Sequence, residues 1–109
     1  MTKNPKMINQ GYKFRGGIKV GLWASSWPNG VLEVGRSSLI LQDKMTGKEY
    51  TFLKQDIVRI EVKKVFPIIG SGIQLHHTNK NYDKKIYFWY LSFRFNKLID
   101  ALKEFGWLR

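Results

Sequence analysis

The only two histidines of the chain, His76 and His77, are adjacent, and imidazole is a common ligand for metal ions in proteins. They stand in a segment that alternates as a β-strand does, where neighbouring side chains point to opposite faces. Two such imidazoles are poorly placed to hold one ion together. The sequence therefore predicts neither a metal site nor a cofactor.

The carboxylates give no sign of acid–base chemistry, because no two of them stand at a spacing that suggests a catalytic pair. The eight are Glu33, Asp43, Glu49, Asp56, Glu61, Asp83, Asp100 and Glu104. The sequence also contains no glycine-rich phosphate loop and no nucleophile elbow. We therefore expect a protein that is not an enzyme.

The charge of the chain is strongly positive: 19 Lys and Arg stand against 8 Asp and Glu, a formal net charge of +11. Such a balance favours anionic partners, which include nucleic acid, acidic lipid headgroups and acidic proteins. No cysteine is present, so nothing in the sequence requires an oxidising compartment. No apolar run approaches the roughly 20 residues that span a bilayer. We expect a cytoplasmic protein, peripheral at a membrane at most.

The length of 109 residues fits one domain. Residues 1–16 are polar and lead into the pair Gly16-Gly17, a composition that predicts a flexible basic N-terminal arm. Residues 17–109 are expected to form the single folded domain.

Alternating hydrophobicity predicts seven strands within that domain. The first begins at Ile18 and ends near Trp27, and Pro28-Asn29-Gly30 is expected to form a hairpin turn because Asn-Gly tolerates positive φ. The second runs over Val31–Val34. The remaining five are expected near 38–42, 49–53, 56–66, 73–76 and 86–90.

The period then changes from two to 3.6 residues, which predicts a helix. Its apolar stripe is formed by Phe95, Leu98, Ile99, Leu102 and Phe105. Ser92 is expected to cap its N-terminus and Gly106 its C-terminus. One apolar face of the last strand thus leads into a helix that must lie on the remaining opening of the sheet.

Three aromatic side chains fall on the strand faces opposite the predicted core: Trp23, Tyr87 and Trp89. Exposed rigid aromatics beside Lys and Arg are good anchors for a protein partner or a second copy of the chain. They could also stack on unpaired bases. The alternatives are that the N-terminal arm or a long side chain covers them, or that the inward face of the first strand is the other one.

The order of seven strands and one C-terminal helix resembles the pleckstrin-homology-like (PH-like) superfold. "LEVGRSSLILQDKMTGKEYTFLKQDIVRIEV" is similar to the core of small bacterial PH-like and GRAM-like proteins, and "KIYFWY" with "LIDALKEFGW" is similar to their last strand and helix. The resemblance covers about residues 18–107. It implies an α+β, mainly β fold: a partly open barrel of seven antiparallel strands capped by one C-terminal α-helix.

The resemblance also implies where positive charge gathers. Phosphoinositide-binding relatives place basic residues at the turn between the first two strands, whereas "WPNG" contains none. In the superfold, however, three loops meet at the end opposite the helix. Two of them carry the lysines that could form one anion-binding rim, or that simply remain solvated: Lys44, Lys48, Lys80, Lys84 and Lys85.

The bend Phe66–Gly72 is apolar, so that an exposed tip could insert at a membrane interface or fold back over the core.

Fold alone does not determine function. We expect a non-catalytic binding module that mediates protein–protein interaction or self-association, through the aromatic face or a free strand edge. The alternatives are peripheral binding to anionic phospholipid through the lysine rim and nonspecific binding to nucleic acid.

Overall fold

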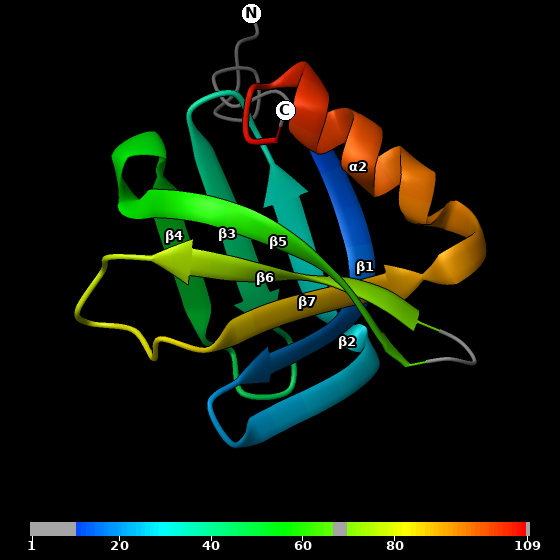
Figure 1. Cartoon of the computed structure of the whole chain (residues 1–109). Coiled ribbons are helices and arrows are strands. Elements are labelled where there is room, and N and C mark those ends of the chain that lie inside the picture. The colour runs from blue at the N-terminus through cyan, green and yellow to red at the C-terminus, as the bar shows by residue number, and fades with distance from the viewer. Residues whose placement is uncertain (1–10, 67–69, 109) are drawn as a thin grey trace, which may run out of the picture.

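Seven antiparallel strands form one strongly curved sheet with the order β4-β3-β2-β1-β7-β6-β5, as Figure 1 shows. The computed structural model describes residues 11–66 and 70–108, and for residues 64–66 it describes the backbone alone. The strands are β1 (Tyr12–Val20), β2 (Trp23–Val34), β3 (Ser38–Asp43), β4 (Glu49–Leu53), β5 (Ile57–Phe66), β6 (Gly70–His77) and β7 (Ile86–Leu91). The helix α2 (Phe95–Glu104) follows β7, so the expected mainly β fold with one C-terminal helix is confirmed.

The predicted position of the first hairpin turn is wrong. The chain turns at Gly21, which adopts φ +60° and donates its N–H to the carbonyl of Lys85 at 2.8 Å. The Pro28–Gly30 stretch lies inside β2, where Gly30 pairs with Gly16. A Cβ on Gly30 would stand 2.9 Å from the carbonyl carbon of Gly17. Glycine is required there because two backbones approach closely, not because a turn needs it.

The predicted boundary of the N-terminal arm is also wrong in part. Residues 12–16 form the first half of β1 and pair with β2, from Tyr12 opposite Val34 to Gly16 opposite Gly30. Tyr12 and Phe14 extend toward the N-terminus the inward-facing alternation of Ile18, and Phe14 is buried. Residues 1–10 lie outside the described part of the chain.

The helix covers one end of the barrel with the predicted apolar stripe. Leu98 and Leu102 are fully buried, whereas Ile99 is only partly so. Each fully buried Leu contributes about 1.5–3 kcal/mol relative to exposure. Gly106 ends the helix with φ +79°, as predicted. Ser92 is not its cap: it opens the short turn η2 (Ser92–Arg94), and its Oγ lies 3.3 Å from that of Ser71.

The barrel is not closed, because β4 and β5 are the two ends of the sheet order. They are joined by the single turn η1 (Lys54–Asp56), which carries the chain across the opening. The apolar bend predicted at residues 66–72 falls partly on residues 67–69, outside the described residues. Within the described residues, no helix is both long enough and apolar enough to cross a membrane.

Candidate functional site

Strand β5 presents one free edge to the opening of the barrel. Among residues 11–66 and 70–108, it pairs with β6 on one side only and ends the sheet. Ile60 and Val62 point to the inside of the barrel, because they lie opposite the fully buried Leu75 and Ile73 of β6. Val62 is nevertheless 44% exposed. This inward-facing valine remains accessible because, in the described part of the chain, no strand pairs with the other edge of β5.

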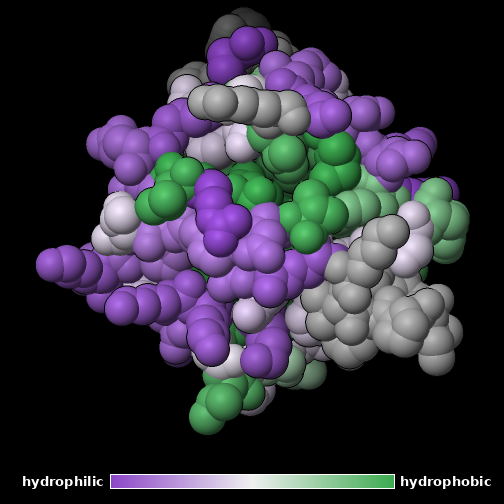
Figure 2. All heavy atoms as spheres, viewed as in Figure 1, coloured by the Kyte–Doolittle hydropathy of each residue, from purple (hydrophilic) through white to green (hydrophobic). Residues whose placement is uncertain are grey.

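Beside this edge lies a hollow of about 350 Å³ between the start of β5 and the chain that follows α2. Figure 2 shows hydrophobic side chains gathered in the opening between β5 and α2, with hydrophilic side chains on both sides. Val58 is 64% exposed there. The β5–β6 ladder skips this residue between Ile57 and Arg59, which leaves it at the rim. The lining residues are Lys54, Ile57, Val58, Arg59, Ile60, Gly106, Trp107 and Leu108.

The wall of the hollow is held by polar contacts of Lys54 and Trp107. Lys54 Nζ donates to the carbonyl oxygen of Phe105 at 2.6 Å and lies 4.7 Å from the centroid of the Trp107 ring. The indole N–H of Trp107 donates to the carbonyl of Gly35 at 2.7 Å. The hollow therefore has a preformed far wall.

The outer face of β5 carries alternating charges. Glu61 lies 3.6 Å from Arg59 and 3.7 Å from Lys63, and His76 Nε2 donates to its Oε1 at 2.8 Å. The hydrogen bond from His76 holds the pKa of Glu61 below its ordinary value. Lys63 and Arg59 act in the same direction, whereas burial opposes them. Glu61 is thus an outward-facing carboxylate that can face a further cation from a partner.

The predicted aromatic group is only partly correct. Tyr87 and Trp89 lie on the outer face, opposite the buried Ile86 and Phe88. Trp23 does not join them, because it pairs with Val20 and shares the inner face, where its indole N–H donates to Asp43 at 2.7 Å. The alternation predicted from Ile18 to Trp27 does not continue through the turn at Gly21, so Trp23 falls on the inner face.

The outer aromatics are also partly covered. The ring centroid of Tyr87 lies 5.7 Å from Lys19 Nζ and 6.0 Å from Lys63 Nζ. A Cβ on Gly17 would stand 2.3 Å from Nε1 of Trp89, so the indole lies directly against the β1 backbone. Both rings are half-buried. Their exposed fractions are thus smaller than those of Val58 and Val62 in β5.

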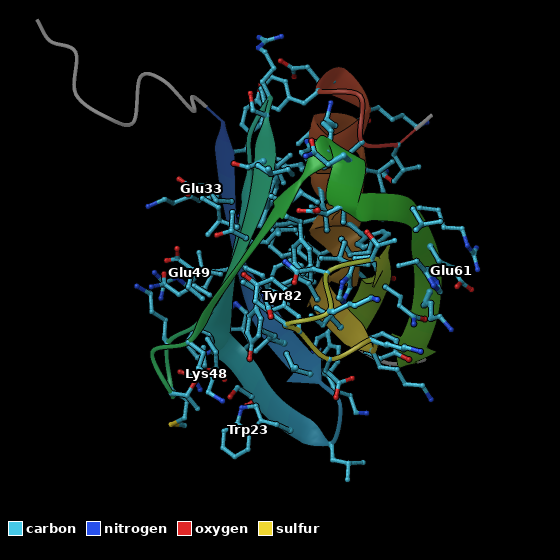
Figure 3. The ribbon with its side chains drawn as sticks, turned by 90° about the vertical axis from the view of Figure 1, so that its left-hand side faces the viewer. Trp23, Glu33, Lys48, Glu49, Glu61 and Tyr82 are labelled. Carbon is cyan, nitrogen blue, oxygen red and sulfur yellow. The ribbon has the colours of Figure 1, made fainter. Side chains whose placement is uncertain are left out.

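The three loops expected to meet at one end of the barrel, two of which carry the predicted lysines, do lie together there, away from α2 in Figures 1 and 3. Trp23, just after the first turn, bonds Asp43 at the start of the β3–β4 turn. Tyr82 of the β6–β7 loop accepts a bond from the backbone N–H of Thr51 in β4 at 3.1 Å. The five lysines on these loops are exposed: Lys44, Lys48, Lys80, Lys84 and Lys85.

Asp43 is a residue that the sequence analysis missed. It is only 2% exposed, and its carboxylate accepts bonds from the Trp23 indole, the Met45 amide at 2.9 Å and the Ser25 hydroxyl at 3.3 Å. Burial raises the pKa of Asp43, but these hydrogen bonds together outweigh burial and lower it. An Asp at the first position of a turn was the available signal, in "DKMTG". The Asp43 carboxylate thus joins the start of β2 to the turn between β3 and β4.

The histidines lie on opposite faces of β6, as predicted. His76 bonds Glu61 on the outer face, whereas His77 lies 5.0 Å from Phe52, ring centroid to ring centroid, and bonds the carbonyl of Asp83 at 2.7 Å. Among residues 11–66 and 70–108, no three His, Asp or Glu side chains are grouped so that they could hold a metal ion.

The free edge of β5, with Val58, Val62 and the adjoining hollow, is the candidate site that these observations favour. Comparison with known proteins does not add a relative: no protein-family model matches the chain, and no significant match is found among characterised proteins.

Proposed function

We propose that this protein is a non-catalytic binding module of the PH-like superfold, and that it holds an extended polypeptide segment against the free edge of β5. The observation that carries the proposal is the exposure of Val58 and Val62, 64% and 44%, beside an edge that ends the sheet. The resemblance to the superfold is supported by the order of seven antiparallel strands and the C-terminal helix.

An added strand fits the chemistry of this edge. Its backbone supplies N–H and C=O groups to those of β5, and its alternate side chains enter the opening. Val62 lies in the inward row and Val58 at the rim, and both lose exposed apolar surface when a segment covers them. A hollow of about 350 Å³ suits side chains of that segment.

The test is selection of ten-residue peptides displayed on phage against the protein. Selected peptides are expected to bind the Val58→Lys/Val62→Lys variant at least tenfold more weakly, because lysines along a strand edge oppose strand addition. The matched control is Leu22→Lys/Met45→Lys, which makes the same change at two exposed apolar residues in the β1–β2 and β3–β4 turns. Equal binding to the wild type and to the β5 variant would exclude the proposal.

A second candidate function is binding to an anionic phospholipid surface. It is favoured by the meeting of the loops that carry Lys44, Lys48, Lys80, Lys84 and Lys85, all of them exposed. Each Lys near such a surface contributes about 1 kcal/mol.

A further inference from the structure

We infer that the strand that β5 accepts is β5 of a second copy of this chain, in a two-fold dimer in which Ile60 lies opposite Ile60 of the partner subunit. The inference rests on the proposed function, since it names the occupant of the same edge.

Symmetry limits the possible registers. Two identical antiparallel strands in one sheet are related by an axis perpendicular to that sheet, so inner faces stay inner and outer faces stay outer. One residue then lies opposite itself. Each residue before this centre faces the residue equally far after it, which makes the charge pattern of the strand decisive.

A centre at Ile60 matches both faces of the strand. On the outer face, Arg59 lies opposite Glu61 of the partner subunit, and the same pair occurs a second time by symmetry. By position along the strand, Val58 lies opposite Val62 of the partner subunit, also twice, with Val58 at the rim where the β5–β6 ladder skips it. These two exposed valines of β5, 64% and 44%, cover each other. Figure 3 shows Glu61 on the side of the barrel formed by β5, away from the labelled Lys48.

The neighbouring registers match less well. A centre at Glu61 places Glu61 opposite itself and Arg59 opposite Lys63, so that like charges face each other three times, which is unfavourable. A centre at Val62 pairs Glu61 with Lys63 but sets Ile60 opposite Lys64. Only the register centred on Ile60 combines opposite charges with apolar pairs.

The first experiment is a charge-reversal cycle read by light scattering over a range of protein concentrations. Arg59→Glu alone and Glu61→Arg alone are each expected to raise the dimer dissociation constant about tenfold, since each creates like-charge pairs. The double variant Arg59→Glu/Glu61→Arg is expected to restore the wild-type constant, because it exchanges the partners of the same pairs. Lys48→Glu is the matched control and leaves the constant unchanged.

The second experiment uses the absence of cysteine from the chain. Ile60→Cys is expected to form an intermolecular disulfide under mild oxidation, since opposite Cα atoms stand about 4.5–5.5 Å apart, within disulfide reach. Val62→Cys is expected not to form one, since two copies of position 62 are displaced by about 13 Å along the strands. Circular dichroism checks that each variant is folded.

A monomer at every concentration, a dimer insensitive to the charge cycle, or preferred crosslinking of Glu61→Cys or Val62→Cys would each overturn the dimer. These outcomes separate the two proposals. A monomer that still binds displayed peptides in a manner dependent on Val58 and Val62 leaves the proposed function standing, whereas a monomer that binds no peptide removes both. In a dimer of the inferred kind, selected peptides compete with dimerisation.

Discussion

Lys54 Nζ lies 2.6 Å from the carbonyl oxygen of Phe105 and donates to it, which joins the turn between β4 and β5 to the residue that follows α2. The same ammonium group lies over the Trp107 ring. One side chain thus connects the two borders of the barrel opening.

Lys54→Ala is expected to destabilise the protein by about 1 kcal/mol, because it removes a charged hydrogen bond and a cation–π contact at a partly exposed site. Urea unfolding measures this change. Lys48→Ala, another exposed lysine in a turn, serves as the control with a change near zero. Equal effects of the two substitutions would show that the Lys54 contacts contribute nothing specific.

Asp43→Asn is expected to destabilise the protein by about 2 kcal/mol at neutral pH, because the buried carboxylate accepts several hydrogen bonds. The folded-state pKa of Asp43 is lowered, so its contribution is present above the unfolded pKa of about 4 and is lost as pH falls through the folded pKa. The stability difference between wild type and variant should therefore shrink below about pH 4.

Urea unfolding at a series of pH values measures this dependence. Glu49→Gln, at an exposed carboxylate of β4, is the control for general charge effects. A difference that stays constant down to pH 2 would contradict the assigned role of the Asp43 charge.

The fold was largely predictable because periodicity depends on the local chain. The alternation of Ile86, Phe88 and Tyr90 and the helical stripe from Leu98 to Leu102 follow from which residues must be inside. The first hairpin was not predictable in this way. Asn29-Gly30 has the composition of a turn, and only the approach of the β1 backbone explains why Gly30 lies in a strand.

Gly16→Ala tests this role of backbone approach. A Cβ on Gly16 would stand 2.0 Å from the carbonyl oxygen of Trp89, so that β1 and β7 must separate. We expect a loss of more than about 2 kcal/mol in unfolding free energy, beyond the usual cost of a surface change. The comparison is Gly47→Ala, where no atom lies within 4 Å but φ is +78°, and the cost is about 1 kcal/mol. A smaller effect at Gly16 than at Gly47 would contradict this explanation.

The candidate site was less predictable than the fold. A free strand edge was expected from the sequence, but which edge is free depends on the order β4-β3-β2-β1-β7-β6-β5. Val58 and Val62 alternate with Arg59, Glu61 and Lys63, a pattern that by itself predicts an inward face. Val62 is exposed because β5 ends the sheet, and Val58 because the β5–β6 ladder skips it, and both are properties of the whole sheet and not of the segment.

The loops β3–β4 and β6–β7, which carry the exposed lysines, can be tested with vesicles that contain phosphatidylserine. If they bind an anionic surface, changing Lys44, Lys80, Lys84 and Lys85 to Glu should abolish vesicle binding, and raising the salt concentration should weaken binding by the wild type. The control variant changes Lys13, Arg94, Lys97 and Lys103 to Glu, which alters the net charge equally at β1, η2 and α2. Co-sedimentation at two ionic strengths measures both effects. Equal loss in the two variants would show that net charge alone, and not the position of the loops, determines binding.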